Sequence, residues 1–187
     1  MATLTKVITM KRLLVFFPAL LLMLTSSAQN AGYMNFTTFG ILAGTSSDKN
    51  PAPLSVIMEH NYRFNKTLAP GIMMGIEQLN ENIMPVALNL KLFIPAQRCA
   101  FFFAGLGGYS VSLEKPGTEG IQKAKGGVLA GLETGLIIPV NGCSSVVIAI
   151  GYRYNELNYD LEDWWVGEYE RKMKLNRFSC RIGISIH

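Results

Sequence analysis

The sequence is poor in the residue types that build metal and redox sites. It holds three cysteines, Cys99, Cys143 and Cys180, and two histidines, His60 and the terminal His187. Zinc sites use three or four such ligands at characteristic short spacings, and these residues match none of them. We therefore expect no metal, no cofactor and no disulfide-built scaffold. An odd cysteine count still permits one disulfide beside one free thiol in an exported protein.

Charge is also scarce, at 16% of the chain, and the 17 basic residues only slightly exceed the 13 acidic ones. Three of the basic residues, Lys6, Lys11 and Arg12, lie at the N-terminus, and without them the count is 14 against 13. Nucleic-acid binding needs a concentrated basic surface. No nucleic-acid partner is expected.

The N-terminal segment has the pattern of an export signal. The basic residues precede an unbroken apolar run from Leu13 to Leu24, and Ser26-Ser27-Ala28 supplies the small residues of a cleavage site. Twelve apolar residues are too few to span a bilayer, which requires about 20. We expect cleavage after Ala28, so that residues 1–28 are a signal peptide and residues 29–187 form one domain.

The rest of the sequence has no long segment of helical period. Instead, stretches of nine to fourteen residues alternate apolar with polar or small residues between turn-forming clusters, which is typical of strands. The eight predicted strands are 33–43, 54–64, 71–80, 83–94, 100–113, 126–138, 146–158 and 172–186.

The two faces of these strands indicate where the protein resides. In the seventh, Val146, Ile148 and Ile150 share one face, while Ala149 and Arg153 lie on the other. The polar faces hold too few charges to solubilise the outside of a soluble barrel or sandwich. Apolar outside and polar inside is the arrangement of a membrane barrel, which must close because lipid cannot satisfy an open sheet edge. The sequence predicts an all-β, closed antiparallel transmembrane barrel with meander topology.

The connections support this interpretation. Three of the four odd-numbered links are long (44–53, 114–125 and 159–171), and the fourth is the tight 81–82. The even-numbered links, 65–70, 95–99 and 139–145, are short and each contains proline. Long external loops and short periplasmic turns are characteristic of outer-membrane barrels, so we expect the N-terminus on the periplasmic side.

A cleavable signal, eight such strands, alternating connections and a final Arg181-Ile-Gly-Ile-Ser-Ile-His187 strand resemble the small outer-membrane β-barrel family, the OmpA-transmembrane-domain and OmpX-like proteins. The resemblance implies residence in the outer membrane of a Gram-negative-type bacterium. It also implies contact with outer-membrane lipid, and with periplasmic chaperones and the barrel-assembly machinery during biogenesis. Family members usually end in an aromatic residue, whereas this chain ends in His187.

The strongest candidate site is a set of charges that alternation places inside the barrel: Glu59, Arg63, Glu77, Lys91, Glu133, Arg153 and Arg181. An eight-stranded barrel is barely wide enough for its own side chains, so these groups should pair. Glu133 lies on the face of Gly127, Gly131 and Gly135, which should leave room for long side chains. The set indicates either an ion-paired plug or a gated narrow pore.

Two further features stand out. Loop 159–171 carries Tyr159, Trp164, Trp165 and Tyr169, which belong either to an aromatic girdle or to an exposed recognition loop. Cys99 precedes the fifth strand and Cys143 follows the sixth, so they are candidates for a disulfide in the oxidising periplasm, with Cys180 left free.

Three functions follow in order of preference. The first is a structural or surface-interaction role, with an extracellular ligand that the sequence does not name. The second is a small passive, porin-like channel. The third is a lipid-modifying enzyme, but alternation puts His60, the only internal histidine, on the lipid face, and no Ser-His-acid group can be built around it. No catalytic residue is assigned, and we expect no enzyme.

Overall fold

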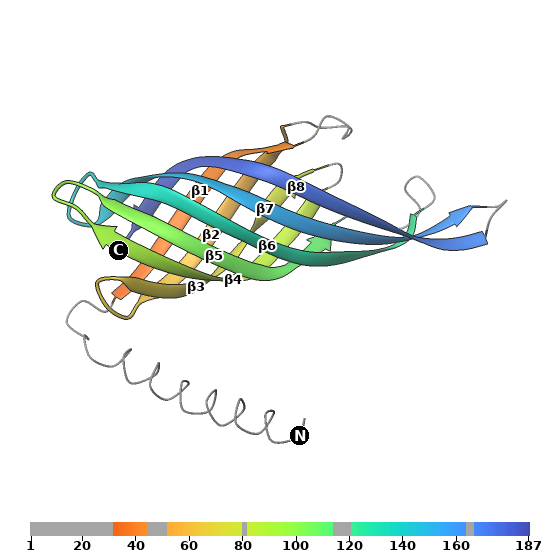
Figure 1. The fold of residues 1–187 in the computed structure, drawn as a ribbon, viewed down its shortest axis with the longest axis horizontal. Helices are drawn as coiled ribbons and strands as arrows, with labels where there is room; N and C mark the ends of the chain where they lie inside the picture. Colours follow the sequence, from red (N-terminus) through yellow and green to blue (C-terminus); the bar gives the residue numbers. More distant parts are fainter. Residues whose placement is uncertain (1–31, 45–51, 80–81, 114–120, 164–166) are drawn as a thin grey trace, which may run out of the picture.

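The computed structural model describes residues 32–44, 52–79, 82–113, 121–163 and 167–187, which form eight strands (Figure 1). The signal peptide expected over residues 1–28 lies outside this range. The strands are β1 (Gly32–Gly44), β2 (Leu54–Arg63), β3 (Leu68–Gln78), β4 (Asn82–Pro95), β5 (Ala100–Ser112), β6 (Ile121–Pro139), β7 (Ser144–Asp163) and β8 (Gly167–Ile186).

Each strand pairs antiparallel with the next, and β8 returns to pair with β1, so that the sheet closes into a barrel. The register of the closing seam is continuous and places Phe39 opposite Ile182 and Gly40 opposite Arg181. Closure leaves no edge strand along the seam and gives both flanking strands backbone partners. The predicted all-β, closed, eight-stranded meander is confirmed.

The barrel has two different ends. We call the end with the short connections 64–67, 96–99 and 140–143 the turn end; β1 begins there and the chain terminates there (Figure 1). At the opposite end, the loop end, β6, β7 and β8 reach beyond the other strands. β7 and β8 have 20 residues each and stay paired out to Asp163 opposite Gly167.

Three predicted connections are shorter than expected. Residues 68–70 belong to β3, since Leu68, Ala69 and Pro70 pair with β4. Most of the expected loop 159–171 is strand, and so are residues 121–125 of the expected loop 114–125. Strands that extend past the membrane need no apolar outer face, so hydropathy stops alternating while backbone pairing continues.

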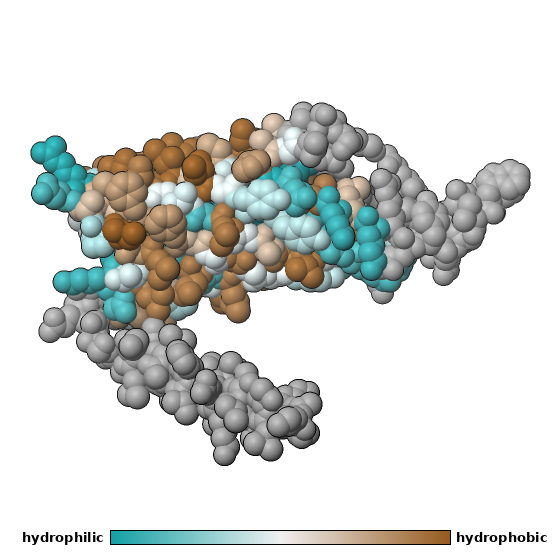
Figure 2. Space-filling model, in the orientation of Figure 1, coloured by the Kyte–Doolittle hydropathy of each residue, from teal (hydrophilic) through white to brown (hydrophobic). Residues whose placement is uncertain are grey.

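Apolar side chains cover the outside of the barrel. Along β4 the exposed and buried residues alternate almost without exception, with Leu88 69% exposed and Ala87 3% exposed. Figure 2 shows hydrophobic residues over the visible side of the barrel body and hydrophilic ones toward its two ends. No helix among the described residues has the length and hydropathy to cross a membrane.

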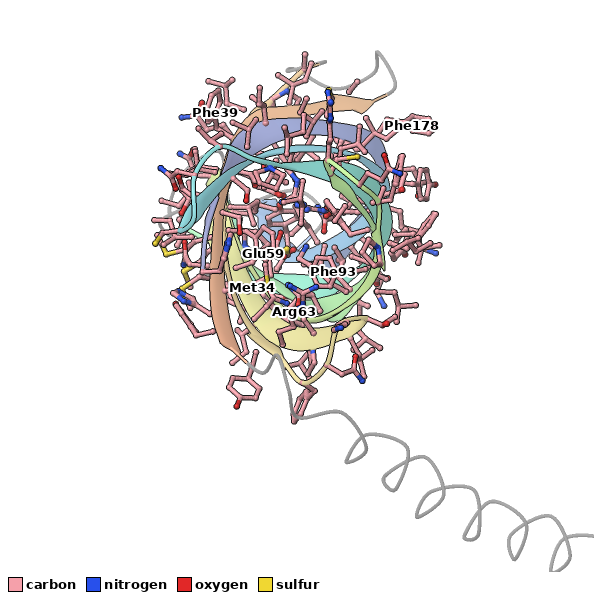
Figure 3. The ribbon with its side chains drawn as sticks, turned by 90° about the vertical axis from the view of Figure 1, so that its left-hand side faces the viewer. Met34, Phe39, Glu59, Arg63, Phe93 and Phe178 are labelled. Carbon is pink, nitrogen blue, oxygen red and sulfur yellow. The ribbon has the colours of Figure 1, made fainter. Side chains whose placement is uncertain are left out.

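The interior is filled in layers. At the turn end lies an apolar cluster that includes Met34, Phe36, Phe93, Phe102 and Ile137. A second apolar cluster, with Leu42, Ile83, Leu157, Tyr159 and Leu175 among its members, lies toward the loop end. Buried charged side chains lie between these two clusters. Figure 3 looks into the barrel from the turn end: Glu59 points into the interior, whereas Phe39 and Phe178 point outward.

Candidate functional site

Six buried charges form one continuous chain of ion pairs across the barrel. Each comes from a different strand, each is at most 5% exposed, and positive and negative groups alternate: Lys91, Glu59, Arg181, Glu133, Arg153, Glu77. We call this set the charge chain. Its three cations and three anions balance, which is the condition under which buried charge is tolerated.

The links of the charge chain are direct. Lys91 Nζ lies 2.8 Å from Glu59 Oε2, and Glu59 Oε1 lies 3.4 Å from Arg181 Nη2. Arg181 contacts Glu133 in turn. Arg153 joins two carboxylates, because its Nη2 lies 3.3 Å from Glu133 Oε1 while its Nη1 contacts Glu77. Glu133 thus has an arginine on each side, and we call it the hub of the charge chain.

Neutral polar side chains add hydrogen bonds to two of the acids, Glu59 and Glu77. Asn89 Nδ2 donates to Glu59 Oε2 over 2.6 Å, and Asn61 Nδ2 donates to Asn89 Oδ1 over the same distance. The Ser55 hydroxyl donates to Glu77 Oε1 over 3.1 Å. Such bonds hold these two carboxylates in position and offset part of the cost of removing them from water.

Aromatic rings close the charge chain at its lysine end. Lys91 Nζ lies 4.9 Å from the ring centroid of Phe36 and 4.7 Å from that of Phe102. Both distances are within cation–π range, so the ammonium is held by two rings as well as by Glu59. The rings belong to the apolar cluster at the turn end and separate the charge chain from that end.

Glycine makes room for the hub. Gly151 on β7 lies opposite Glu133 on β6, and a Cβ at residue 151 would fall 2.7 Å from Glu133 Cγ and 2.6 Å from the Leu132 carbonyl oxygen. Any larger residue would displace the Glu133 side chain or the β6 backbone. Gly135 does the same for a ring, since a Cβ there would lie 2.6 Å from Phe102.

The seventh predicted charge, Arg63, lies apart from the charge chain. It is at the turn end, where its Nη2 donates to the Lys66 carbonyl oxygen over 2.9 Å and its guanidinium lies 5.1 Å from the Phe93 ring centroid. Sequence reasoning also missed a buried arginine. Arg177 is 1% exposed and donates to the Leu42 carbonyl oxygen over 3.1 Å. Its even spacing from Ser179 and Arg181 on β8 was sufficient signal to place it inside.

The expected disulfide does not appear in the structure, where Cys99, Cys143 and Cys180 are all free. Cys99 precedes β5, whereas Cys143 precedes β7, so two inter-strand spacings of about 4.8 Å separate their positions. A disulfide requires its Cα atoms to lie within about 7 Å. Cys143 does follow the sixth strand, as expected, but it is the last residue of the 140–143 turn and so lies next to β7 rather than next to β5.

The structure also places the expected recognition residues differently. Tyr159 is 3% exposed and packs inside β7 with Leu157 and Leu175, so it belongs neither to a girdle nor to an exposed loop. Trp164 and Trp165 lie outside the described residues, as does the side chain of Tyr169. Tyr62 and Phe64, in edge contact with ring centroids 5.2 Å apart, provide exposed aromatic residues at the turn end instead.

His60 lies on the outer surface, as alternation predicts. Its ring stacks on Tyr33 with centroids 5.9 Å apart and contacts the Tyr33 hydroxyl, and Asn35 Nδ2 lies 3.3 Å from His60 Nδ1. These two partners are a phenol and an amide, which do not make a nucleophile–base–acid arrangement with His60. Within the described residues there is also no group of three or more metal-ligating side chains.

Comparisons with known proteins agree on the fold. No family model and no curated protein matches the sequence. Among solved structures, Neisserial surface protein A matches with a TM-score of 0.59 at 12% identity, covering 84% of this chain and 99% of its own. OprG from Pseudomonas aeruginosa matches with a TM-score of 0.64 at 11% identity, covering 83% of this chain and 95% of its own. Outer membrane protein W of E. coli matches with a TM-score of 0.53 at 9% identity, covering 87% of this chain and 99% of its own. The chain has the fold of small eight-stranded outer-membrane barrels, as the resemblance implies.

Proposed function

We propose that this chain is an integral outer-membrane protein with a structural or surface-interaction role, and that its lumen is a closed plug. Two observations support it: an apolar outer surface of the kind that faces lipid, and the likeness in fold to outer-membrane barrels. The turn end faces the periplasm in this proposal, because short turns lie on that side in barrels of this kind.

The charge chain is the main observation in support of a closed plug. It crosses the lumen with balanced charge, and two clusters of apolar side chains fill the barrel nearer its ends. An ion entering the lumen would have to leave water at an apolar layer and then compete with charge-assisted bonds that are already made. This favours a plug over a constitutively open pore.

The loop end supports the surface-interaction part. β6, β7 and β8 continue past the rest of the barrel, and in the proposed orientation this extension projects outside the cell (Figure 1). Lys125 and Asp160 form an ion pair of 2.9 Å there, with side chains 45% and 32% exposed. Polar side chains of this extension, such as Lys125 and Asp160, offer hydrogen-bonding groups to an external partner. No enzymatic role is proposed, since His60 has no catalytic partners in the contacts described above.

Conductance measurements test the plug. The mature chain, reconstituted in a planar bilayer at neutral pH, is expected to give no unitary conductance steps. A small passive channel is the second candidate, because Arg153 holds two carboxylates and could release one without losing both. Reproducible steps from the unaltered protein would contradict the plug and establish this alternative.

A further inference from the structure

The turn end contains a pocket that the charge chain does not use. Its volume is about 710 Å³, within the range of small-molecule sites. Met34, Phe93 and Ile137, all members of the apolar cluster at this end, form its inner part. Polar side chains from the 96–99 turn, from the ends of β2 and β7 and from the C-terminus line the remainder. Figure 3 looks into this end of the barrel, with Met34, Phe93 and Arg63 inside the strand ring.

The ionisable side chains of the lining are Arg63, Arg98, Cys99 and His187, and no aspartate or glutamate is among the residues that line it. Arg63 is fixed in place by the Lys66 carbonyl oxygen and the Phe93 ring. Arg98 extends from the exposed 96–99 turn. Two guanidinium groups that line one pocket suit recognition of a carboxylate or phosphate.

Buried hydroxyl groups supply an independent observation. Ser145 lines the pocket, is 2% exposed, and its Oγ has no hydrogen-bond partner among the described residues. Ser185 lies opposite Ser145 across β7 and β8 and is likewise buried, with an Oγ that has no partner among them. Because buried polar groups normally make hydrogen bonds, an unused hydroxyl in a cavity indicates an acceptor supplied by a ligand.

We propose that the turn-end pocket binds a small anionic amphiphile, namely a carboxylate or phosphate attached to an apolar or aromatic body. The anion lies between the two arginines, the Ser145 hydroxyl donates to it, and the apolar body rests on Met34, Phe93 and Ile137. The site is separated from the charge chain by the Phe93 and Phe102 rings, so it requires neither a closed nor an open lumen.

The probe for this site is 3-phenylpropionate, with neutral 3-phenylpropanol as the matched control. Both are titrated calorimetrically into the mature chain in phosphatidylcholine nanodiscs at low salt. The carboxylate is expected to bind saturably at one site, and the alcohol at least about tenfold more weakly, since charge-assisted bonds contribute more than 1.4 kcal/mol. Equal affinity for the two probes, or no saturable binding of the carboxylate, would overturn the proposal.

Variants locate the site. Arg98→Gln changes an exposed turn residue and leaves the barrel interior intact, and adding Arg63→Gln removes both guanidinium groups. The single change should lower the affinity for 3-phenylpropionate severalfold, and the double change should lower it at least about tenfold. The affinity for the alcohol should be unaltered in both variants. Lys66→Gln is the control, because Lys66 is an exposed cation of the neighbouring turn that does not line the pocket. Wild-type affinity in the double variant would refute the site.

Nanodisc composition then separates two sources of the anion. If lipid headgroups reach the pocket, replacing phosphatidylcholine by phosphatidylglycerol should lower the affinity for 3-phenylpropionate, because the anionic headgroups compete for the site. If the natural ligand is a soluble periplasmic anion, the affinity should be the same in both lipids once surface charge is screened by salt. Conductance of the same protein is measured in parallel, so that failure of the plug and failure of this site are recorded separately.

Discussion

Replacing Glu133 by glutamine is expected to lower the free energy of unfolding by about 3–5 kcal/mol, the cost typical of breaking a buried ion pair by removing one partner. Glutamine keeps the shape of the side chain but removes the charge that both Arg153 and Arg181 contact. Urea unfolding of the protein in lipid vesicles, followed by the loss of the folded band in unheated gel samples, measures the change.

A double-mutant cycle assigns that cost to the charge chain. The loss of unfolding free energy in the double variant Glu133→Gln with Arg153→Met should be smaller than the sum of the losses in the two single variants. The difference, which is the coupling energy, should be about 1–3 kcal/mol. Lys125→Gln serves as the control, because Lys125 pairs with Asp160 at a half-exposed site. Its effect should be below about 1 kcal/mol and additive with that of Glu133→Gln. Additivity of Glu133 with both Arg153 and Arg181 would mean that no network exists.

Ile150→Arg should cost about 2–4 kcal/mol, as expected for a charge placed on the lipid face near the middle of a bilayer. Ile150 is 57% exposed and lies six residues into β7, opposite Thr134 and Cys180 of the neighbouring strands. A soluble barrel would show the opposite behaviour, because an exposed isoleucine replaced by arginine there would cost almost nothing. The same vesicle unfolding assay distinguishes the two.

Depth supplies the matched control for this substitution. Ile186 is also an outward isoleucine, 51% exposed, but it is the last residue of β8 at the turn end. Ile186→Arg should cost about 0–1 kcal/mol, since the guanidinium can reach the interface there. Ile150→Leu should be nearly neutral. Equal costs for arginine at residues 150 and 186 would contradict the placement of the membrane.

Most of the sequence prediction rested on the alternation of apolar and polar side chains along each strand. A period of two fixes the face of each residue once the strand is identified, so it placed Glu59, Lys91 and Arg153 inside without any knowledge of pairing. What it could not supply is which cation meets which carboxylate. That depends on the stagger of strands around the closed barrel, through which Arg153 reaches Glu77 on a distant strand.

The prediction was least accurate where the hydrophobic signal ends. Residues 121–125 and 159–163 are strand, although their polar composition looks like loop. The β6–β7 pairing there also contains register shifts, between Ile121 and Lys123 and between Ala124 and Gly126. Gly126 has a φ of +70°, which side-chain-bearing residues rarely adopt. Irregular pairing breaks the period of two from which the strand would have been identified.

The central claim is that the apolar face of the sheet lies in lipid and the polar face in a closed interior. Spin labels at residues 148 and 150, in a background with the three native cysteines replaced, test it in bilayers. Both labels should collide with oxygen dissolved in the lipid and be protected from a water-soluble nickel chelate. Labels at residues 147 and 149, which are 1% and 3% exposed, should be protected from both reagents. Ready access of the nickel chelate to residues 148 and 150 would show that this face is in water, and would contradict the account.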